Sequence, residues 1–182
     1  QPLDSDLTAI AALSTTIYGR SLLTLANAAA GRTSFDLWTT VMKATTETRT
    51  SNSVLAADAE LKFAMAANTK YALRFRLWYD TVAAADFKFR TNGPAAPTLV
   101  EITRSTIIPV GTAFSNIRVE VGYSAADITV LSTLGTGGYV QLDGIIHNGA
   151  NAGDFEFQWA QNTSDVGNTS VLAGSYLEWH QV

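Results

Sequence analysis

The sequence predicts a mainly β protein: an antiparallel β-sandwich or jelly-roll-like head, preceded by a short α-helical N-terminal stem. Beyond Arg32, about ten segments alternate apolar and polar residues, and turn residues separate them at intervals of about eight to fifteen positions. No segment between them has helical periodicity, so a fold of alternating strands and helices does not fit. No repeat of fixed length runs through them either, which argues against a parallel β-helix. Short strands with frequent turns are typical of sandwiches and jelly rolls.

Residues 1–34 are predicted to be a helical stem for oligomerisation and attachment, and residues 35–182 the β-sandwich head. Two short amphipathic helices are expected in the stem, the first capped by Asp4 or Ser5 and the second ended by Gly31. Helices of this length are not stable alone in water, so they must pack against the head or against other copies of the chain. The apolar residues expected to be buried in that contact are Leu3, Leu7, Ile10, Leu13, Ile17, Leu22 and Leu25.

The clearest strand of the head is expected at 70–81, where large apolar residues alternate with polar ones. One strand is expected within 37–49, and Asp58 is interpreted as a break before the next. The remaining strands are expected at 60–67, 86–92, 116–123, 128–131, 139–149, 154–161 and 171–182, with one or two strands at 98–109 and a loop at 162–170. The aromatic residues expected in the core are Phe75, Phe89, Phe155, Phe157 and Trp159.

The composition excludes several classes of protein. A hydrophobic content of 47% is sufficient for a core, and a charged content of 15% is low, which suits a surface in contact with other protein. A net charge of −4, with no cluster of Lys and Arg, argues against nucleic-acid binding. The chain has no cysteine, and it has no apolar run long enough to span a membrane. The first residues, QPLDSD, show neither an initiator Met nor a signal-peptide pattern, so we expect the natural chain to begin earlier or to be processed.

No catalytic, cofactor or metal site is predicted. His147 and His180 are the only histidines, and neither has a neighbouring nucleophile or second ligand in the sequence. The loop at 135–138 lacks the lysine of a phosphate-binding loop and is interpreted as a strand connection. The acidic residues alternate along strands, as on solvated faces, and lack the spacing of a calcium loop. We therefore expect a protein that is not an enzyme.

Trp78 stands apart because it shares the polar face of its strand with Arg74 and Arg76. A tryptophan among arginines is typical of cation–π packing at a subunit interface, or of a platform on which a sugar stacks. We favour the subunit interface over a position at the edge of the core and over a ligand site.

Several strings resemble proteins of tailed bacteriophages. LSTTIYGRSLL at 13–23, followed by AAAGRT at 28–33, resembles the segment that precedes the tip in phage fibre proteins. The strings ELKFAMAANTKYALRF, DFKF…NGPAAPT and GDFEFQWAQNTSD…TSVLAGSYLEW resemble a family of small phage virion proteins, and the two likenesses together cover most of the chain. The resemblance implies a homotrimeric β-structure on a tail or capsid. The polar break at 14–16 departs from the pattern and argues against a long coiled coil.

We therefore expect a structural protein on the surface of the virion: the distal part of a tail fibre or spike, which trimerises and attaches to the host surface. Its partners would be its own copies, other tail or capsid proteins, and a glycan or protein of the host. The alternatives are a capsid decoration or head-fibre protein and, less favoured, a glycan-cleaving tailspike. The loop residues expected to contact the host are Asn92, Gly93, Thr136, Gly137, Asn162 and Asn168.

Overall fold

The computed structural model describes residues 25–27, 30–31, 35, 37–107, 114–121, 129–131 and 137–182. Residues Trp38–Val182 form one compact unit, of which the preceding residues are not part. In the N-terminal part, Ala30 and Gly31 are helical, and the side-chain oxygen of Asn27 accepts the N–H of Ala30 at 2.9 Å, as a helix cap does. Leu25 is described and half-buried there. Most of the two predicted helices lies outside the described residues, including Leu3, Leu7, Ile10, Leu13, Ile17 and Leu22.

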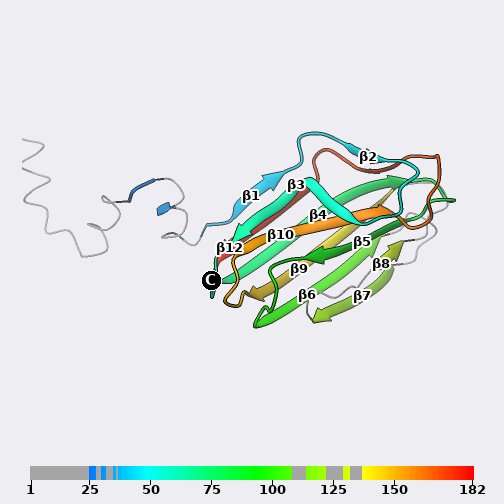
Figure 1. The fold of residues 1–182 in the computed structure, drawn as a ribbon. Coiled ribbons are helices and arrows are strands. Elements are labelled where there is room, and N and C mark those ends of the chain that lie inside the picture. Colours follow the sequence, from blue (N-terminus) through cyan, green and yellow to red (C-terminus); the bar gives the residue numbers. More distant parts are fainter. Residues whose placement is uncertain are drawn as a thin grey trace, which may run out of the picture. The chain divides into compact units, whose positions relative to one another are not determined.

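The described residues of the compact unit form twelve strands in two antiparallel sheets that pack face to face (Figure 1). The strands are β1 (Thr39–Met42), β2 (Glu47–Arg49), β3 (Ala56–Met65), β4 (Lys70–Thr81), β5 (Phe87–Asn92), β6 (Leu99–Ile107), β7 (Phe114–Val121), β8 (Thr129–Leu131), β9 (Gly138–His147), β10 (Gly153–Gln161), β11 (Thr169–Val171) and β12 (Tyr176–Gln181). The large sheet has the order β1-β12-β4-β9-β6-β7, with β11 beside β4 and β2 beside β11. The small sheet has the order β3-β10-β5-β8. The predicted mainly β, antiparallel sandwich is confirmed.

Most connections carry the chain from one sheet to the other. The chain passes from β3 in the small sheet to β4 in the large sheet, back to β5, and on to β6. The same alternation links β8, β9, β10 and β11. The connecting loops therefore cross the two ends of the sandwich. The neighbours β6 and β7 are an exception, because they pair with each other at an edge of the large sheet.

The first and last residues of the sandwich lie at one end, which we call the near end (Figure 1). Trp38 lies against His180, with ring centroids 4.3 Å apart, and the N–H of Val182 donates to the carbonyl of Lys70 at 3.0 Å. The β3–β4, β5–β6 and β9–β10 loops meet at this end and hydrogen-bond to one another. The opposite, far end carries Gly137 and the β4–β5 and β10–β11 loops, which also hydrogen-bond to each other.

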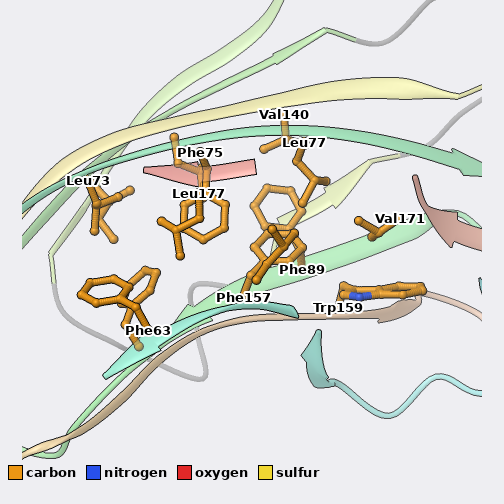
Figure 2. Close-up of a cluster of buried hydrophobic side chains, with 14 of the residues drawn as sticks. Phe63, Leu73, Phe75, Leu77, Phe89, Val140, Phe157, Trp159, Val171 and Leu177 are labelled. Carbon is orange, nitrogen blue, oxygen red and sulfur yellow. The ribbon is translucent and has the colours of Figure 1, made fainter. Parts of the chain in front are cut away.

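The core lies between the two sheets and is rich in aromatic rings (Figure 2). All five aromatic residues predicted in the core have no exposed surface, which confirms that prediction: Phe75, Phe89, Phe155, Phe157 and Trp159. Phe157 of the small sheet packs against Phe75 of the large sheet, with ring centroids 5.7 Å apart. Contacts of this kind across the two layers bury apolar surface and so hold the sheets together.

The prediction of a single strand within 37–49 is wrong. The structure has two strands there, β1 and β2, separated by an irregular segment at 43–46. The carboxylate of Glu60 holds that segment, because it accepts the N–H groups of Ala44 and Thr45 at 2.7 and 3.3 Å. The hydrogen bonds to Glu60 of β3 therefore hold residues 43–46 in an irregular conformation, although the composition of 37–49 favours a continuous strand.

Asp58 was predicted to break the chain before the next strand, but it lies inside β3. The register of β3 with β10 shifts between Glu156 and Gln158, which marks a bulge. The Asp58 carboxylate accepts the N–H groups of Glu60 and Leu61, each at 3.0 Å. It thus supplies partners for N–H groups that the bulge removes from the ladder.

The C-terminal stretch also divides into two strands. β11 begins at Thr169, within the loop predicted at 162–170, and pairs there with Thr81 of β4. Gly174 has a φ angle of 86°, in the left-handed region that favours glycine, and it allows the turn that separates β11 from β12.

Charged side chains join the two sheets where β1 and β2 approach β3. The side-chain nitrogen of Lys43 lies 2.9 Å from Asp58 and 3.3 Å from Glu47. Arg49 contacts Glu47 at 2.6 Å and places its guanidinium 3.9 Å from the ring centre of Trp159. Trp159 in turn donates its indole N–H to Asp58 at 3.1 Å. We call these five residues the charged cluster.

Candidate binding surface

The outer face of the large sheet carries large apolar side chains that solvent reaches. Among the strand residues whose side chains the structure describes, the exposed large apolar ones lie on this face: Met42, Trp78, Leu99 and Ile145, which are 62%, 40%, 39% and 48% exposed. By contrast, the outward positions of β5 and β10 in the small sheet hold mainly polar or charged side chains. Because exposed apolar patches are a feature of interaction sites, this face is the candidate binding surface.

Three aromatic rings from neighbouring strands meet on this face, toward the far end. Trp78 of β4 lies opposite Tyr139 of β9, and their ring centroids are 5.4 Å apart. Tyr176 of β12 packs against Trp78 with a centroid distance of 6.2 Å. The backbone N–H of Trp78 donates to the hydroxyl of Ser175 at 3.0 Å, which fixes the strand beside β12. We call Trp78, Tyr139 and Tyr176 the aromatic cluster.

Polar side chains bonded to one another adjoin the aromatic cluster. Arg76 donates from both terminal nitrogens to one oxygen of Asp143, each at 3.2 Å. Gln141 donates its side-chain amide to the other oxygen of Asp143 at 2.7 Å. The side chains of Arg76 and Asp143 are 20% and 39% exposed, so their mutual bonds order them while solvent still reaches them. We call Arg76, Gln141 and Asp143 the polar network.

The surface around the aromatic cluster carries no excess of positive charge, since Asp80 lies two residues from Trp78 on the same face of β4. Asp143 compensates the charge of Arg76 at 3.2 Å. Burial raises the pKa of Tyr139 above its ordinary value, and Tyr176 and Asp143 add to the increase although Arg76 opposes it. The phenol of Tyr139 therefore stays protonated at neutral pH and can both donate and accept a hydrogen bond.

A row of polar residues crosses the same face and separates its apolar parts. Five residues stand in register on neighbouring strands: Thr40, Glu178, Arg74, Asp143 and Thr103. Met42 and the aromatic cluster lie on the far-end side of this row, and Leu99 and Ile145 lie on the near-end side. We call these five residues the polar row.

Neither arginine of β4 packs on Trp78 in the described part of the chain. Arg74 places its guanidinium 4.2 Å from the ring centre of Trp38, and Arg76 pairs with Asp143. Residues on one face of a strand are about 7 Å apart along the chain, farther than neighbours on adjacent strands. The contact of Trp78 with a second subunit stays a prediction.

The residues predicted to contact the host lie at opposite ends of the sandwich. Asn92 and Gly93 are at the near end, where the β5–β6 loop begins. Gly137, Asn162 and Asn168 are at the far end. These loops therefore do not lie together at one end of the sandwich, and their contact with the host stays a prediction.

Neither a metal site nor a membrane span is found in the parts of the chain that the structure describes. No group of three or more His, Cys, Asp or Glu side chains there could hold a metal ion. None of the helices in those parts is long and apolar enough to cross a membrane. His147 and His180 both lie on outward positions at the near end. Thr136 is outside the described residues.

The sequence marked Trp78 as unusual but not the residues that surround it. Tyr139, Tyr176, Gln141 and Asp143 belong to β9 and β12, and they reach Trp78 only because of the register of these strands with β4. Alternation along one strand carries no information about that register. The available signal is the position of Tyr139 beside the apolar residue Val140, which is buried, because alternation places neighbouring residues of a strand on opposite faces.

Comparison with known proteins gives no family for the chain. No model of a known protein family matches it, and no curated protein matches it.

Proposed function

We propose that the chain is a structural protein of a tailed-bacteriophage virion, the distal part of a tail fibre or spike, and that it attaches to the host surface. The observation that carries the proposal is that the sandwich begins and ends at its near end, where Trp38 packs on His180 and Val182 bonds to Lys70. This arrangement supports a domain carried at the tip of a stem, because a chain that enters at the near end leaves the far end and the sheet faces for contact with other molecules. The strings at 13–23 and 28–33, which resemble the pre-tip segment of fibre proteins, precede this domain.

We infer a jelly-roll topology for the head. The strands β1-β12-β4-β9 of the large sheet and β3-β10-β5-β8 of the small sheet alternate along the chain, except that β5 and β8 both belong to the small sheet, and this pattern is typical of the two sheets of a jelly roll. On this interpretation β6 and β7 are an added hairpin that extends the large sheet. The strand order supports the finer topology in addition to the sandwich.

The helical stem makes the protein a homotrimer in this proposal. Its apolar seam would be buried between copies: Leu3, Leu7, Ile10, Leu13, Ile17, Leu22 and Leu25. Three identical heads held together bind a surface of repeated ligands with an avidity that one head lacks. Attachment is therefore effective even where each contact is weak.

Immunogold electron microscopy tests the proposal. Antibodies against residues 38–182 would be applied to the phage particles that carry this gene, with antibody pre-absorbed on the pure chain as the control. We expect gold at the tips of tail fibres or spikes. Gold on the capsid would replace this function with that of a capsid decoration or head-fibre protein. Particles that bind no antibody would overturn both functions.

A further inference from the structure

We propose that the aromatic cluster and the polar network form one binding site for an uncharged glycan, with Trp78 as the ring on which a sugar stacks. The inference deepens the proposed attachment function and rests on it for the source of the glycan, a bacterial surface polysaccharide. The site itself follows from the contacts of the outer face of the large sheet.

Trp78 supplies the apolar half of a sugar site. A pyranose ring presents a face of C–H groups, which packs on an aromatic ring through dispersion and through the burial of apolar surface. Trp78 is 40% exposed although Tyr139 and Tyr176 flank it at 5.4 and 6.2 Å between ring centroids. The flanking rings hold the indole in place, so little side-chain freedom is lost when a ligand binds.

The polar network supplies the hydrogen bonds that orient a sugar. Sugar hydroxyls both donate and accept hydrogen bonds. A carboxylate has about four acceptor positions. In Asp143, Arg76 and Gln141 use three of these positions, so one remains for a sugar hydroxyl. The phenols of Tyr139 and Tyr176 add hydroxyl groups beside the stacking ring. Sites for small polar ligands combine in this way an apolar surface with a few fixed polar groups.

The charges of the face select an uncharged ligand. Arg76 is paired with Asp143 at 3.2 Å, and Arg74 stands in register with Glu178 on one side and Asp143 on the other. The described outward positions of β4, β6, β9 and β12 hold three basic residues (Lys70, Arg74 and Arg76) and four acidic ones (Asp80, Glu101, Asp143 and Glu178), so the face has no excess of positive charge. A glycan rich in phosphate or carboxylate groups needs cations that are free to pair with it, which this arrangement does not offer.

A second copy of the chain fits this face less well than a glycan does. A protein that covered all the exposed apolar residues would also have to bury the polar row, which lies between Trp78 and Ile145. Charged residues are depleted at the centre of protein interfaces, and burying them is costly. A short oligosaccharide can cover the aromatic cluster and reach Asp143 without burying the rest of the row.

Binding of the 182-residue chain to immobilised oligosaccharides tests the proposal. The probes are neutral repeat units of bacterial surface polysaccharides, built from hexoses and N-acetylhexosamines, with sialylated and phosphorylated oligosaccharides for comparison. We expect binding to at least one neutral probe, and an affinity that salt changes little. Trp78→Ala should weaken this binding about tenfold or more, and Trp78→Phe should weaken it less because it keeps a ring. Gln141→Ala should weaken it without removing the stacking surface.

Ile145→Ala is the matched control, because Ile145 is exposed on the same face but on the other side of the polar row. It should leave glycan affinity unchanged, and thermal unfolding of each variant checks that the fold is intact. The proposal would be overturned if the chain bound none of the neutral probes, or if it bound only anionic probes. It would also be overturned if Trp78→Ala and Ile145→Ala lost equal glycan affinity. The same holds if Trp78→Ala changed the mass of the protein oligomer in solution and left glycan binding intact. None of these results alters the immunogold result, so the site can fail while the virion function stands.

Discussion

Gly138 lies directly against the ring of Tyr79, so that a Cβ atom at this position would come within 2.5 Å of the Cζ atom of Tyr79. The two residues are partners across β4 and β9. The ring of Tyr79 stacks on Phe87 at a centroid distance of 4.4 Å and an angle of 11°, so it has little room to move. Gly138 is the first residue of β9. The close approach of the Tyr79 ring explains why this position holds a glycine, which has no side chain.

Gly138→Ala is expected to destabilise the sandwich by about 1–3 kcal/mol, because the new methyl group overpacks a filled region. Gly153→Ala is the matched control, since Gly153 also begins a strand and its added Cβ would meet Pro94 only at an ordinary 3.5 Å. Urea unfolding followed by tryptophan fluorescence measures both. Equal stability of the two variants would contradict the packing role of Gly138.

Tyr79→Phe is expected to raise the free energy of unfolding by about 1 kcal/mol, because it removes a buried hydroxyl without a hydrogen-bond partner among the described residues. Tyr71→Phe should have the opposite effect and cost about 1–2 kcal/mol, because the Tyr71 hydroxyl accepts the N–H of Ala66 at 2.8 Å. The same urea unfolding experiment compares the two. A loss of stability in Tyr79→Phe as large as in Tyr71→Phe would refute this account of the hydroxyl.

Asp58→Asn is expected to destabilise the head by about 3–5 kcal/mol, because it removes the nearest carboxylate from the buried ammonium group of Lys43, at 2.9 Å, and leaves only the more distant carboxylates of Glu47 and Glu60. Neither side chain of this pair is exposed to solvent. The double variant Lys43→Met with Asp58→Asn should be more stable than Asp58→Asn alone, since no uncompensated charge is left. Asp154→Asn, at an exposed position of β10, is the control and should change stability by less than about 0.5 kcal/mol. The charged cluster would have no structural importance if Asp58→Asn behaved like this control.

Stability should fall with acidification through the titration of Glu47. Burial tends to raise the pKa of Glu47, but the N–H of Ala59, the guanidinium of Arg49 and the charge of Lys43 together lower it below its ordinary value of 4.5. A lowered pKa in the folded state favours folding above pH 4.5, and this contribution is lost as the pH falls through the pKa of the folded state.

Glu47→Gln is therefore expected to be less stable than the unchanged chain at pH 7, with a difference that shrinks as the pH falls below 4.5. Thermal unfolding midpoints measured from pH 7 to about pH 3 show the trend. A difference that stays constant over this range would rule out the titration of Glu47 as its cause.

The buried faces of the strands could be predicted because alternation along a strand records burial directly. Tyr71, Leu73, Phe75, Leu77 and Tyr79 alternate in β4, and all five are buried. The charged cluster could not be predicted in the same way. Lys43 is an isolated lysine after a short strand, and its buried partner Asp58, at 2.9 Å, lies in the part of β3 where the register with β10 shifts. That geometry depends on contacts between segments far apart in the sequence.

Only part of the candidate site could be predicted from the sequence, because the site also depends on contacts between distant segments. Trp78 was conspicuous on a polar face, but Tyr139 and Tyr176 lie on other strands, and only register brings the three rings together. The loops chosen as host contacts could not be assigned to one end, because which end a loop occupies depends on strand direction in the folded sandwich. Asn92 and Asn162 accordingly lie at opposite ends.

We propose that copies of this chain associate through the N-terminal stem, which carries the sandwich at a tip. Multi-angle light scattering of the 182-residue chain measures the mass of the species in solution. We expect one species with three times the chain mass of 19.4 kDa. Leu7→Asp and Ile10→Asp, together in the stem, should reduce the mass toward that of a single chain. A stable species of 19.4 kDa for the unchanged chain would rule out this association.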